Sequence, residues 1–111
     1  MEAMAKASFI RITPRKMGLI ADEIRGKGIN EALSLLRFSP RKRTAGVLFG
    51  LIKSAAANAN QKGTVDVDTL VVKQVLVGPG PILKRFRARA KGSAFPIKKR
   101  TCNVRITVAE K

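Results

Sequence analysis

The segment between positions 84 and 100 carries the side chains best suited to chemistry, because it holds eight basic residues and no acidic one. The basic residues are Lys84, Arg85, Arg87, Arg89, Lys91, Lys98, Lys99 and Arg100. Four of them, from position 85 to position 91, occupy every second position. Residues two apart share one face of an extended strand, so that face is entirely cationic. Arg and Lys on an extended arm suit phosphate contacts. The pattern therefore predicts a strand that binds a polyanion.

The charge of the whole chain indicates the same class of ligand. The 111 residues carry a net charge of +16 and an isoelectric point near 11.4. Residues 1–79 contribute +7, and the much shorter stretch 80–111 contributes +9. Such a large excess of positive over negative charge is typical of nucleic-acid-binding proteins. A membrane is a poorer match, because no apolar run reaches the roughly 18 residues that span a bilayer. No signal peptide is expected either.

Side chains for catalysis or metal binding are scarce. The chain has no histidine, which removes the commonest general base. Cys102 is the only cysteine, which excludes an intramolecular disulfide and a cysteine metal cluster. Among the seven carboxylates, Asp66 and Asp68 come nearest to a pair, but their setting indicates a solvated turn before a strand. We therefore expect no enzyme, no cofactor and no metal site.

Three helices are predicted in the first 60 residues. Thr13 and Pro14 form a helix start, as N-cap and first helical residue. An apolar stripe follows at Met17, Ile20, Ala21 and Ile24. Asn30 is expected to cap a short second helix that ends near residue 38. Ser39 and Pro40 repeat the start signal and predict a long helix over residues 40–60. Its predicted buried stripe comprises Val47, Leu48, Leu51, Ile52, Ala55 and Ala59.

Strands are predicted at residues 6–12, 70–77 and 102–108. The last alternates cleanly and should turn Cys102, Val104, Ile106 and Val108 to the core, with Asn103, Arg105 and Thr107 on the other face. Cys102 is then a small core hydrophobe. Residues 78–81 read Gly-Pro-Gly-Pro, which predicts a bend or bulge where an edge strand leaves the sheet.

The basic segment should form an arm that projects from this domain. Ten strand steps from Pro81 to Lys91 span roughly 33 Å at ~3.3 Å each, against a radius of gyration of ~13 Å for a compact domain of this size. The predicted class is α+β, with three helices packed on a small three-stranded antiparallel sheet and a long protruding basic β-hairpin. We expect one domain, residues 1–111, with a globular part (1–79 and 101–111) and an extended hairpin (80–100).

Several short strings along the chain carry a family resemblance. They are Ile-Arg-Gly-Lys at 24–27, Ser-Ala-Ala-Ala-Asn-Ala at 54–59, Gly-Pro at 80–81 followed by Lys-Arg at 84–85, Arg-Ala-Lys-Gly at 89–92 and Lys-Arg-Thr at 99–101. With the length and the order of predicted elements, they make the chain resemble the bacterial ribosomal large-subunit protein L-twenty-two family. The resemblance implies a globular domain on the outside of the large subunit and a hairpin that threads through ribosomal RNA.

The resemblance also implies partners and site residues. Arg89, Ala90, Lys91 and Gly92 would form a tip that lines the nascent-peptide exit tunnel, near nascent peptides and macrolides, and Leu83, Lys84 and Arg85 would correspond to a segment that affects macrolide response. Other expected partners are large-subunit ribosomal RNA and neighbouring ribosomal proteins, in a cytoplasmic ribosome, with no membrane and no homo-oligomer. Besides the cations at 84–100, the expected RNA-binding residues are Arg11, Arg15, Lys16, Arg25, Lys27, Arg41, Lys42 and Arg43.

One alternative of a different class is an architectural DNA-binding protein with β-ribbon arms. Such proteins are also small and basic, and they kink DNA with an apolar wedge at the tip of the arm. Here the prolines lie at the base of the arm, at Pro79 and Pro81, and the tip reads Lys-Gly-Ser. The chain also begins with a predicted strand instead of dimerisation helices. These features favour the ribosomal hypothesis.

Overall fold

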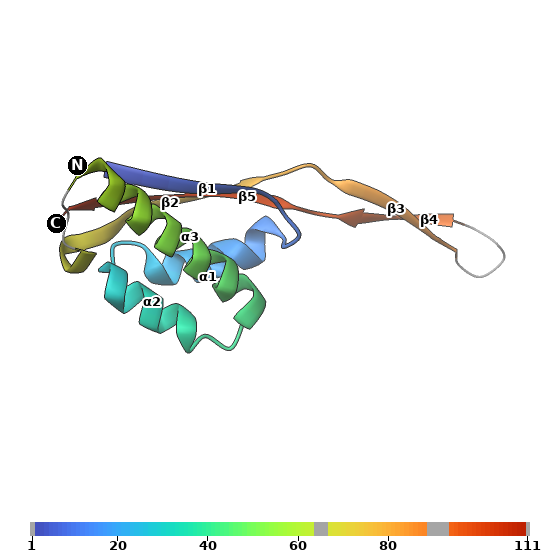
Figure 1. Cartoon of the computed structure of the whole chain (residues 1–111). Helices are drawn as coiled ribbons and strands as arrows, with labels where there is room; N and C mark the ends of the chain where they lie inside the picture. Colours follow the sequence, from blue (N-terminus) through green and yellow to red (C-terminus); the bar gives the residue numbers. More distant parts are fainter. Residues whose placement is uncertain (1, 64–66, 89–93, 111) are drawn as a thin grey trace.

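The computed structural model describes residues 2–63, 67–88 and 94–110, and it confirms the predicted α+β class. Three helices pack on a sheet: α1 (Pro14–Ile24), α2 (Ile29–Arg37) and α3 (Lys42–Lys62). The sheet consists of β1 (Glu2–Ile10), β2 (Leu70–Pro79) and β5 (Cys102–Glu110), and a short 3-10 helix, η1 (Val67–Thr69), precedes β2. Strands β3 (Leu83–Ala88) and β4 (Ala94–Lys99) form a separate hairpin. The hairpin extends from one end, so the molecule measures 64 × 26 × 16 Å (Figure 1).

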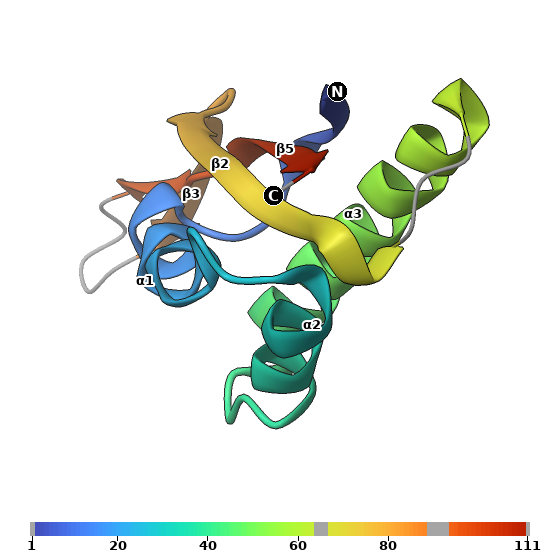
Figure 2. The same ribbon diagram turned by 90° about the vertical axis from the view of Figure 1, so that its left-hand side faces the viewer.

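The three-stranded sheet is antiparallel and has the order β1–β5–β2, which puts the C-terminal strand in the middle. The helices all lie on one face of this sheet (Figures 1 and 2). Helices α1 and α3 contact the strands, whereas α2 lies further away and packs mainly on α3. Alternate strand residues point toward the helices and are buried, as expected when one face of a sheet is covered. They are Ala3, Ala5, Val72, Val75, Val104, Ile106 and Val108.

Helix α1 forms as the sequence predicts. The Thr13 hydroxyl accepts a hydrogen bond from the Lys16 backbone N–H at 3.4 Å, and Pro14 is the first helical residue. The predicted apolar stripe, from Met17 to Ile24, is fully buried. The helix ends before Gly26, whose φ of +80° is the left-handed conformation that glycine adopts freely. The Gly26 N–H then donates to the Val72 carbonyl at 2.9 Å, which ties the end of α1 to β2.

Several predicted boundaries are wrong. Strand β1 starts at Glu2 instead of residue 6, because Ala3 and Ala5 pack on the helices although alanine is a poor strand former. Asn30 does not cap α2: Gly28 holds that position, and the Asn30 amide donates to the Asp68 carboxylate at 2.6 Å. Helix α3 runs over Lys42–Lys62 instead of residues 40–60. The Ser39 hydroxyl accepts from the Arg41 N–H in the preceding turn, at 3.3 Å.

Strand β5 follows the predicted alternation with one exception. Cys102 and the apolar residues after it are buried, and burial raises the pKa of the Cys102 thiol, which keeps it protonated. Thr107, predicted on the outer face, is only 8% exposed. It lies between Met4 of β1 and Gln74 of β2 in the strand register. A central strand has neighbours on both sides, so longer flanking side chains can cover a small residue even on a face without helices.

The hairpin leaves the sheet at Gly80, whereas the bend was expected to begin at Gly78. Strand β2 stays paired with β5 through Pro79. The Gly80 N–H donates to the Thr101 carbonyl at 3.0 Å, and the Thr101 hydroxyl donates to the Pro81 carbonyl at 2.5 Å. A Cβ on Gly80 would lie 2.6 Å from the Thr101 oxygen. A side chain at position 80 would have to displace the Thr101 hydroxyl, so the close contact of Gly80 with Thr101, together with these hydrogen bonds, joins the hairpin to the domain.

The hairpin pairs in a simple antiparallel register, with Leu83 opposite Lys99 and Ala88 opposite Ala94. Pro96 pairs opposite Phe86, a position open to proline because β4 is an edge strand of this two-stranded ribbon. The predicted tip, residues 89–92, lies outside the described residues, and so does Asp66. Asp68 lies in η1. In the described ranges, no helix is long and apolar enough to cross a membrane.

Candidate nucleic-acid interface

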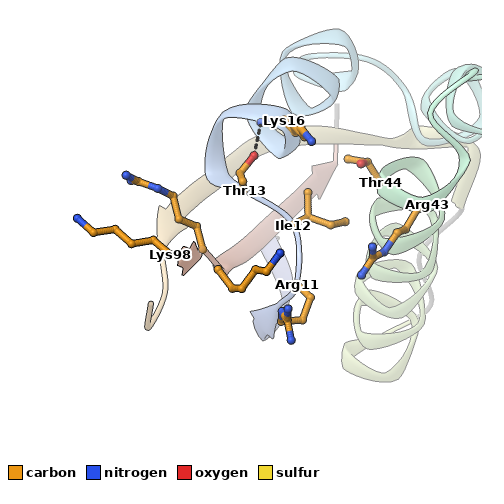
Figure 3. Close-up of a pocket in the computed structure, with 9 residues that line it drawn as sticks. Arg11, Ile12, Thr13, Lys16, Arg43, Thr44 and Lys98 are labelled. Carbon is orange, nitrogen blue, oxygen red and sulfur yellow. Dashed lines mark hydrogen bonds between the residues drawn. The ribbon is translucent and has the colours of Figure 1, made fainter. Parts of the chain in front are cut away.

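A hollow of about 470 Å³ lies where the hairpin meets the domain (Figure 3). Its described lining comes from four parts of the chain: the β1–α1 loop, the start of α1, the start of α3 and the end of β4 with the residue after it. Six of the nine lining residues are basic and none is acidic. The basic residues are Arg11, Lys16, Arg43, Lys98, Lys99 and Arg100, all of them exposed. We call this cavity the basic hollow.

The end of β1 is bent in a way that brings Arg11 to the basic hollow. The register between β1 and β5 shifts between Ala7 and Ile10, and Phe9 in this bulge has a φ of +59°. A bulky residue in the left-handed region is strained, and such strain is concentrated at functional sites. The Ile12 N–H then closes a tight turn onto the Ile10 carbonyl at 2.8 Å, and the Ile12 side chain is buried. Ile12 thus anchors the loop while Arg11 stays exposed.

Two helices begin at the basic hollow. Thr13 and Lys16 at the start of α1 line it, as do Arg43 and Thr44 at the start of α3. A helix N-terminus carries partial positive charge and favours acidic side chains nearby. Neither first turn contains an acidic residue, and both contain basic ones. The side chains therefore add to the dipole field instead of offsetting it, an arrangement that favours a bound anion.

The end of the hairpin completes the positive surface. Lys98, Lys99 and Arg100 project from β4 and the residue that follows it. A neighbouring hollow of about 550 Å³ shares Thr13 and Arg100 with the first and adds Arg15. The salt bridges between described residues involve other cations, at positions 25, 27 and 73. The cations of the basic hollow are therefore available to an external anion such as the phosphates of RNA, which bind Arg and Lys by charge-assisted hydrogen bonds.

Other predicted site residues lie elsewhere. Arg25 pairs with Asp22 and also donates to the Val75 carbonyl at 2.7 Å, so it joins α1 to β2. Lys27 lies 3.8 Å from the Glu31 carboxylate. Each of these two cations thus has an internal carboxylate partner, and its binding to RNA stays a prediction.

The remaining predicted cations divide between α3 and the hairpin. Arg41 and Lys42 are exposed beside the start of α3. Lys84 and Arg85 are exposed on β3, and the Arg85 guanidinium donates to the Lys84 carbonyl at 2.9 Å. The backbone of Arg87 belongs to β3. Arg89 and Lys91 lie outside the described residues.

Two exposed cations that no sequence pattern had marked as binding residues, Lys6 and Arg105, lie opposite each other in the sheet. Arg105 was expected on the outer face of β5, but its neighbour could not be known without the register of β1. A cross-strand pair of cations is a signal that only strand pairing reveals. In the described part of the chain, no group of three or more His, Cys, Asp or Glu side chains lies close enough to hold a metal ion.

A small basic α+β domain with a cation-lined hollow at the foot of a long hairpin defines a polyanion-binding protein with an extended arm. Comparison with known proteins is more specific. Residues 5–109 match the family model described as ribosomal protein L22p/L17e. This chain therefore belongs to the ribosomal protein L22p/L17e family, which confirms the resemblance noted in its sequence. As a member of this family of ribosomal proteins, it is not an enzyme.

Individual relatives match over all or nearly all of their length. The large ribosomal subunit protein uL22 of Desulfovibrio desulfuricans is 53% identical over 110 residues, which cover 99% of this chain and 97% of that protein. The protein of the same name from Geobacter metallireducens is 51% identical over 111 residues and 100% of both chains. That of Syntrophotalea carbinolica is 48% identical, also over 100% of both. The similarity therefore includes the hairpin as well as the globular domain.

Proposed function

We propose that this protein is a structural constituent of the large ribosomal subunit, in the cytoplasmic ribosome, and that it binds large-subunit ribosomal RNA through the basic hollow and the hairpin. The family membership supports the subunit assignment. Neighbouring ribosomal proteins are further partners. Two copies of a chain with a net charge of +16 repel each other, so the protein works as a single copy.

The basic hollow is the observation that carries this proposal. Cations from four separate parts of the chain converge there, beside two helix N-termini. Clustered like charges destabilise a folded protein unless a counter-charge is present. RNA phosphates provide that counter-charge and gain hydrogen bonds in the hollow.

Folded RNA fits the side chains better than unpaired RNA or DNA. The chain has no Trp or Tyr and only five Phe, so it has few aromatic side chains that could stack on single-stranded bases. Extended Arg and Lys side chains instead suit the phosphates and the shape of A-form RNA. The family favours ribosomal RNA over the alternative of an architectural DNA-binding protein.

We further propose that the hairpin threads through the RNA and that its tip, residues 89–92, lines the nascent-peptide exit tunnel near the macrolide-binding region. The family membership and the Arg-Ala-Lys-Gly string support the position of the tip. The length of the molecule, 64 Å, supports an arm that reaches well beyond the globular domain. An arm embedded in RNA also links distant RNA segments, so the protein aids subunit assembly.

Salt dependence of RNA binding tests the role of the basic hollow. We expect Arg11→Ala/Arg43→Ala/Lys98→Ala to flatten the plot of log K against log salt by about two to three units, at ~0.7–0.9 per phosphate contact. The matched control is Arg37→Ala/Lys53→Ala/Lys62→Ala, which removes the same charge from other exposed surfaces. Equal slopes for the two variants would reject the hollow as a binding site. Equal binding of duplex DNA and structured ribosomal RNA would favour the architectural alternative.

A deletion separates the tunnel role from RNA binding. Removal of residues 83–85 takes an odd number of residues from β3, so the side-chain alternation beyond the deletion reverses and the tip shifts. The core loses no residue, so the domain should fold and enter the subunit normally. We expect an altered macrolide response or altered stalling of nascent chains in such ribosomes. Normal incorporation with unchanged tunnel behaviour would show that the tip does not face the tunnel.

A further inference from the structure

The face of the sheet opposite the helices has its own pattern of side chains. No helix of the described chain covers it (Figures 1 and 2). The strand register sets Lys6 of β1 opposite Arg105 of β5, and Arg105 opposite Leu76 of β2. The next row toward the chain ends consists of Met4, Thr107 and Gln74. A row with two cations thus lies beside a row of apolar and uncharged residues.

The Lys6–Arg105 pair is unfavourable by itself. Like charges directly opposite each other in a sheet repel and destabilise the pairing of the strands. The carboxylate of Glu2, four residues before Lys6 on β1, is engaged with Lys73. The other salt bridges between described residues, Asp22–Arg25 and Lys27–Glu31, lie at the end of α1 and the start of α2. The protein therefore maintains two adjacent cations at this position without an internal counter-charge among the described residues.

The cations border a hollow of about 340 Å³ that can receive a ligand. Ser8 and Asn103 line it with Lys6, Arg105 and the apolar Leu76. The Asn103 side-chain oxygen accepts from the Phe9 N–H at 3.1 Å, which fixes the amide, and its NH₂ group makes no hydrogen bond within the described part of the chain. Hydroxyl, amide, ammonium and guanidinium groups together offer several donors to one anion. These are the groups that contact phosphate in nucleic-acid complexes.

Apolar side chains flank the donors. Leu76 is 39% exposed and Met4 is 51% exposed on this face. Solvent-exposed apolar groups beside a phosphate site can pack against the sugar of a nucleotide, whereas an isolated phosphate needs no such surface. We propose that the open face of the sheet, centred on Lys6 and Arg105, is a second binding site for the RNA backbone. The proposal rests on the proposed function for the identity of the ligand.

The position of this site relates it to the hairpin. Gly78 lines the hollow on the open face, and the next residue, Pro79, lines the hollow that contains Arg15 and Arg100. The two surfaces therefore approach each other where the hairpin leaves the sheet. RNA bound on both would hold the foot of the hairpin from two sides, which would fix the direction of the arm. An arm that must follow one path through folded RNA requires such a fixed direction.

The test uses the full-length protein and in vitro transcribed large-subunit ribosomal RNA. We expect Lys6→Ala/Arg105→Ala to flatten the salt dependence of binding by about one to two units, at ~0.7–0.9 per contact. The matched control, Arg37→Ala/Lys53→Ala, removes two exposed cations from other surfaces and should change the slope less. The thermal unfolding midpoint of Lys6→Ala/Arg105→Ala should stay equal or rise, because the substitution removes a repulsion. A slope equal to that of the wild type would overturn the proposal.

The two proposals fail in different ways. If the wild-type protein does not bind the RNA, the proposed function itself is wrong. If it binds, and the Arg11/Arg43/Lys98 variant weakens binding while Lys6→Ala/Arg105→Ala does not, only the second site is wrong. Polyglutamate serves as a probe for an acidic protein segment. If it binds the wild type but not the Lys6/Arg105 variant, while the RNA slope is unchanged, the face belongs to a protein partner and the proposal is overturned.

A proximity experiment locates the RNA directly. An iron chelate attached to Ser8→Cys should cleave RNA bound on the open face with hydroxyl radicals. Cys102 is buried, so in the folded variant the chelate should attach to the introduced cysteine and not to Cys102. Ser34→Cys on α2 is the control, and it should give weaker cleavage or cleavage at other nucleotides. Absence of cleavage from Ser8→Cys in a complex that binds RNA normally would overturn the proposal.

Discussion

The starts of α1 and α3 differ from the start of α2 in how charge is arranged. Basic residues and no acidic ones occupy the first turns of α1 and α3. Helix α2 has Glu31 in its first turn and Arg37 in its last, the arrangement that a helix dipole favours. Glu31 also pairs with Lys27. The charged side chains of α2 thus stabilise the folded protein. The cations of the basic hollow destabilise the helix starts beside them, and they are available to a ligand.

This difference shows why net charge alone is a weak guide to a binding surface. Arg25, Lys27 and Lys73 contribute to the net charge of the chain but have internal carboxylate partners. Arg11, Arg43 and Lys98 have the same formal charges and gather in one cavity. If RNA binds as we propose, only the second group gains a new counter-charge from its phosphates.

Both regions rest on one core, and a core truncation should destabilise them together. Ile106 is fully buried in β5. We expect Ile106→Ala to lower the free energy of unfolding by about 2–5 kcal/mol, the usual range for such truncations. Chemical denaturation measures the effect. The neighbouring Arg105→Ala is the control, and it should change stability little because Arg105 is exposed. A larger loss from Arg105→Ala would mean that the outer face of β5 holds more of the structure than its burial indicates.

Gly80 tests the junction that carries the hairpin cations to the basic hollow. Gly80→Ala should destabilise the junction by about 1–3 kcal/mol through overpacking, because the new methyl group would meet the Thr101 hydroxyl. RNA affinity should fall as well, since Lys98, Lys99 and Arg100 would be displaced. Gly46→Ala is the matched control: the added methyl group meets nothing within 4 Å, and alanine in a helix gains about 0.5–1 kcal/mol. Equal behaviour of the two variants in denaturation and RNA binding would contradict a tight junction.

Reversal of one charge at each helix start contrasts the two regions directly. Arg43→Glu introduces an acidic residue in the first turn of α3 and should raise stability by about 0.3–1 kcal/mol. The same substitution should weaken RNA binding. Glu31→Lys in α2 should lower stability by a similar amount and leave the salt dependence of RNA binding nearly unchanged. The free energy of unfolding and the RNA affinity, both measured for each variant, test these expectations. If Arg43→Glu lowers stability without a change in affinity, the first turn of α3 is not an anion site.

The smallest expected effect concerns an exposed cation with an internal partner. The Lys73 ammonium donates to the Glu2 carboxylate and lowers the pKa of that group below its ordinary value of 4.5. A lowered pKa in the folded state contributes stability above the ordinary value, and this contribution is lost as the pH falls through the folded value. Lys73→Ala should therefore slightly reduce the loss of stability below about pH 4.5, as measured by unfolding at several pH values. An unchanged acid profile would show that the pair contributes nothing.

Local patterns in the sequence were sufficient for much of the fold. The Thr13–Pro14 start and the apolar stripe of α1 appear as predicted, because helix caps and a 3.6-residue period are properties of neighbouring residues. The alternation of Cys102, Val104, Ile106 and Val108 likewise identified the buried face of β5. The basic strand was recognised from its period of two. These features depend on contacts within one element or on a single buried face.

Tertiary structure alone decided which cations share a surface. Arg11 and Lys98 are 87 positions apart in the sequence, yet a bulge in β1 and the Gly80–Thr101 contact bring both to the basic hollow. The pairing of Lys6 with Arg105 and the burial of Thr107 depend on the register of a central strand with two neighbours. Strand pairing and loop closure join distant segments, and no local pattern of residues encodes which partner a side chain will meet.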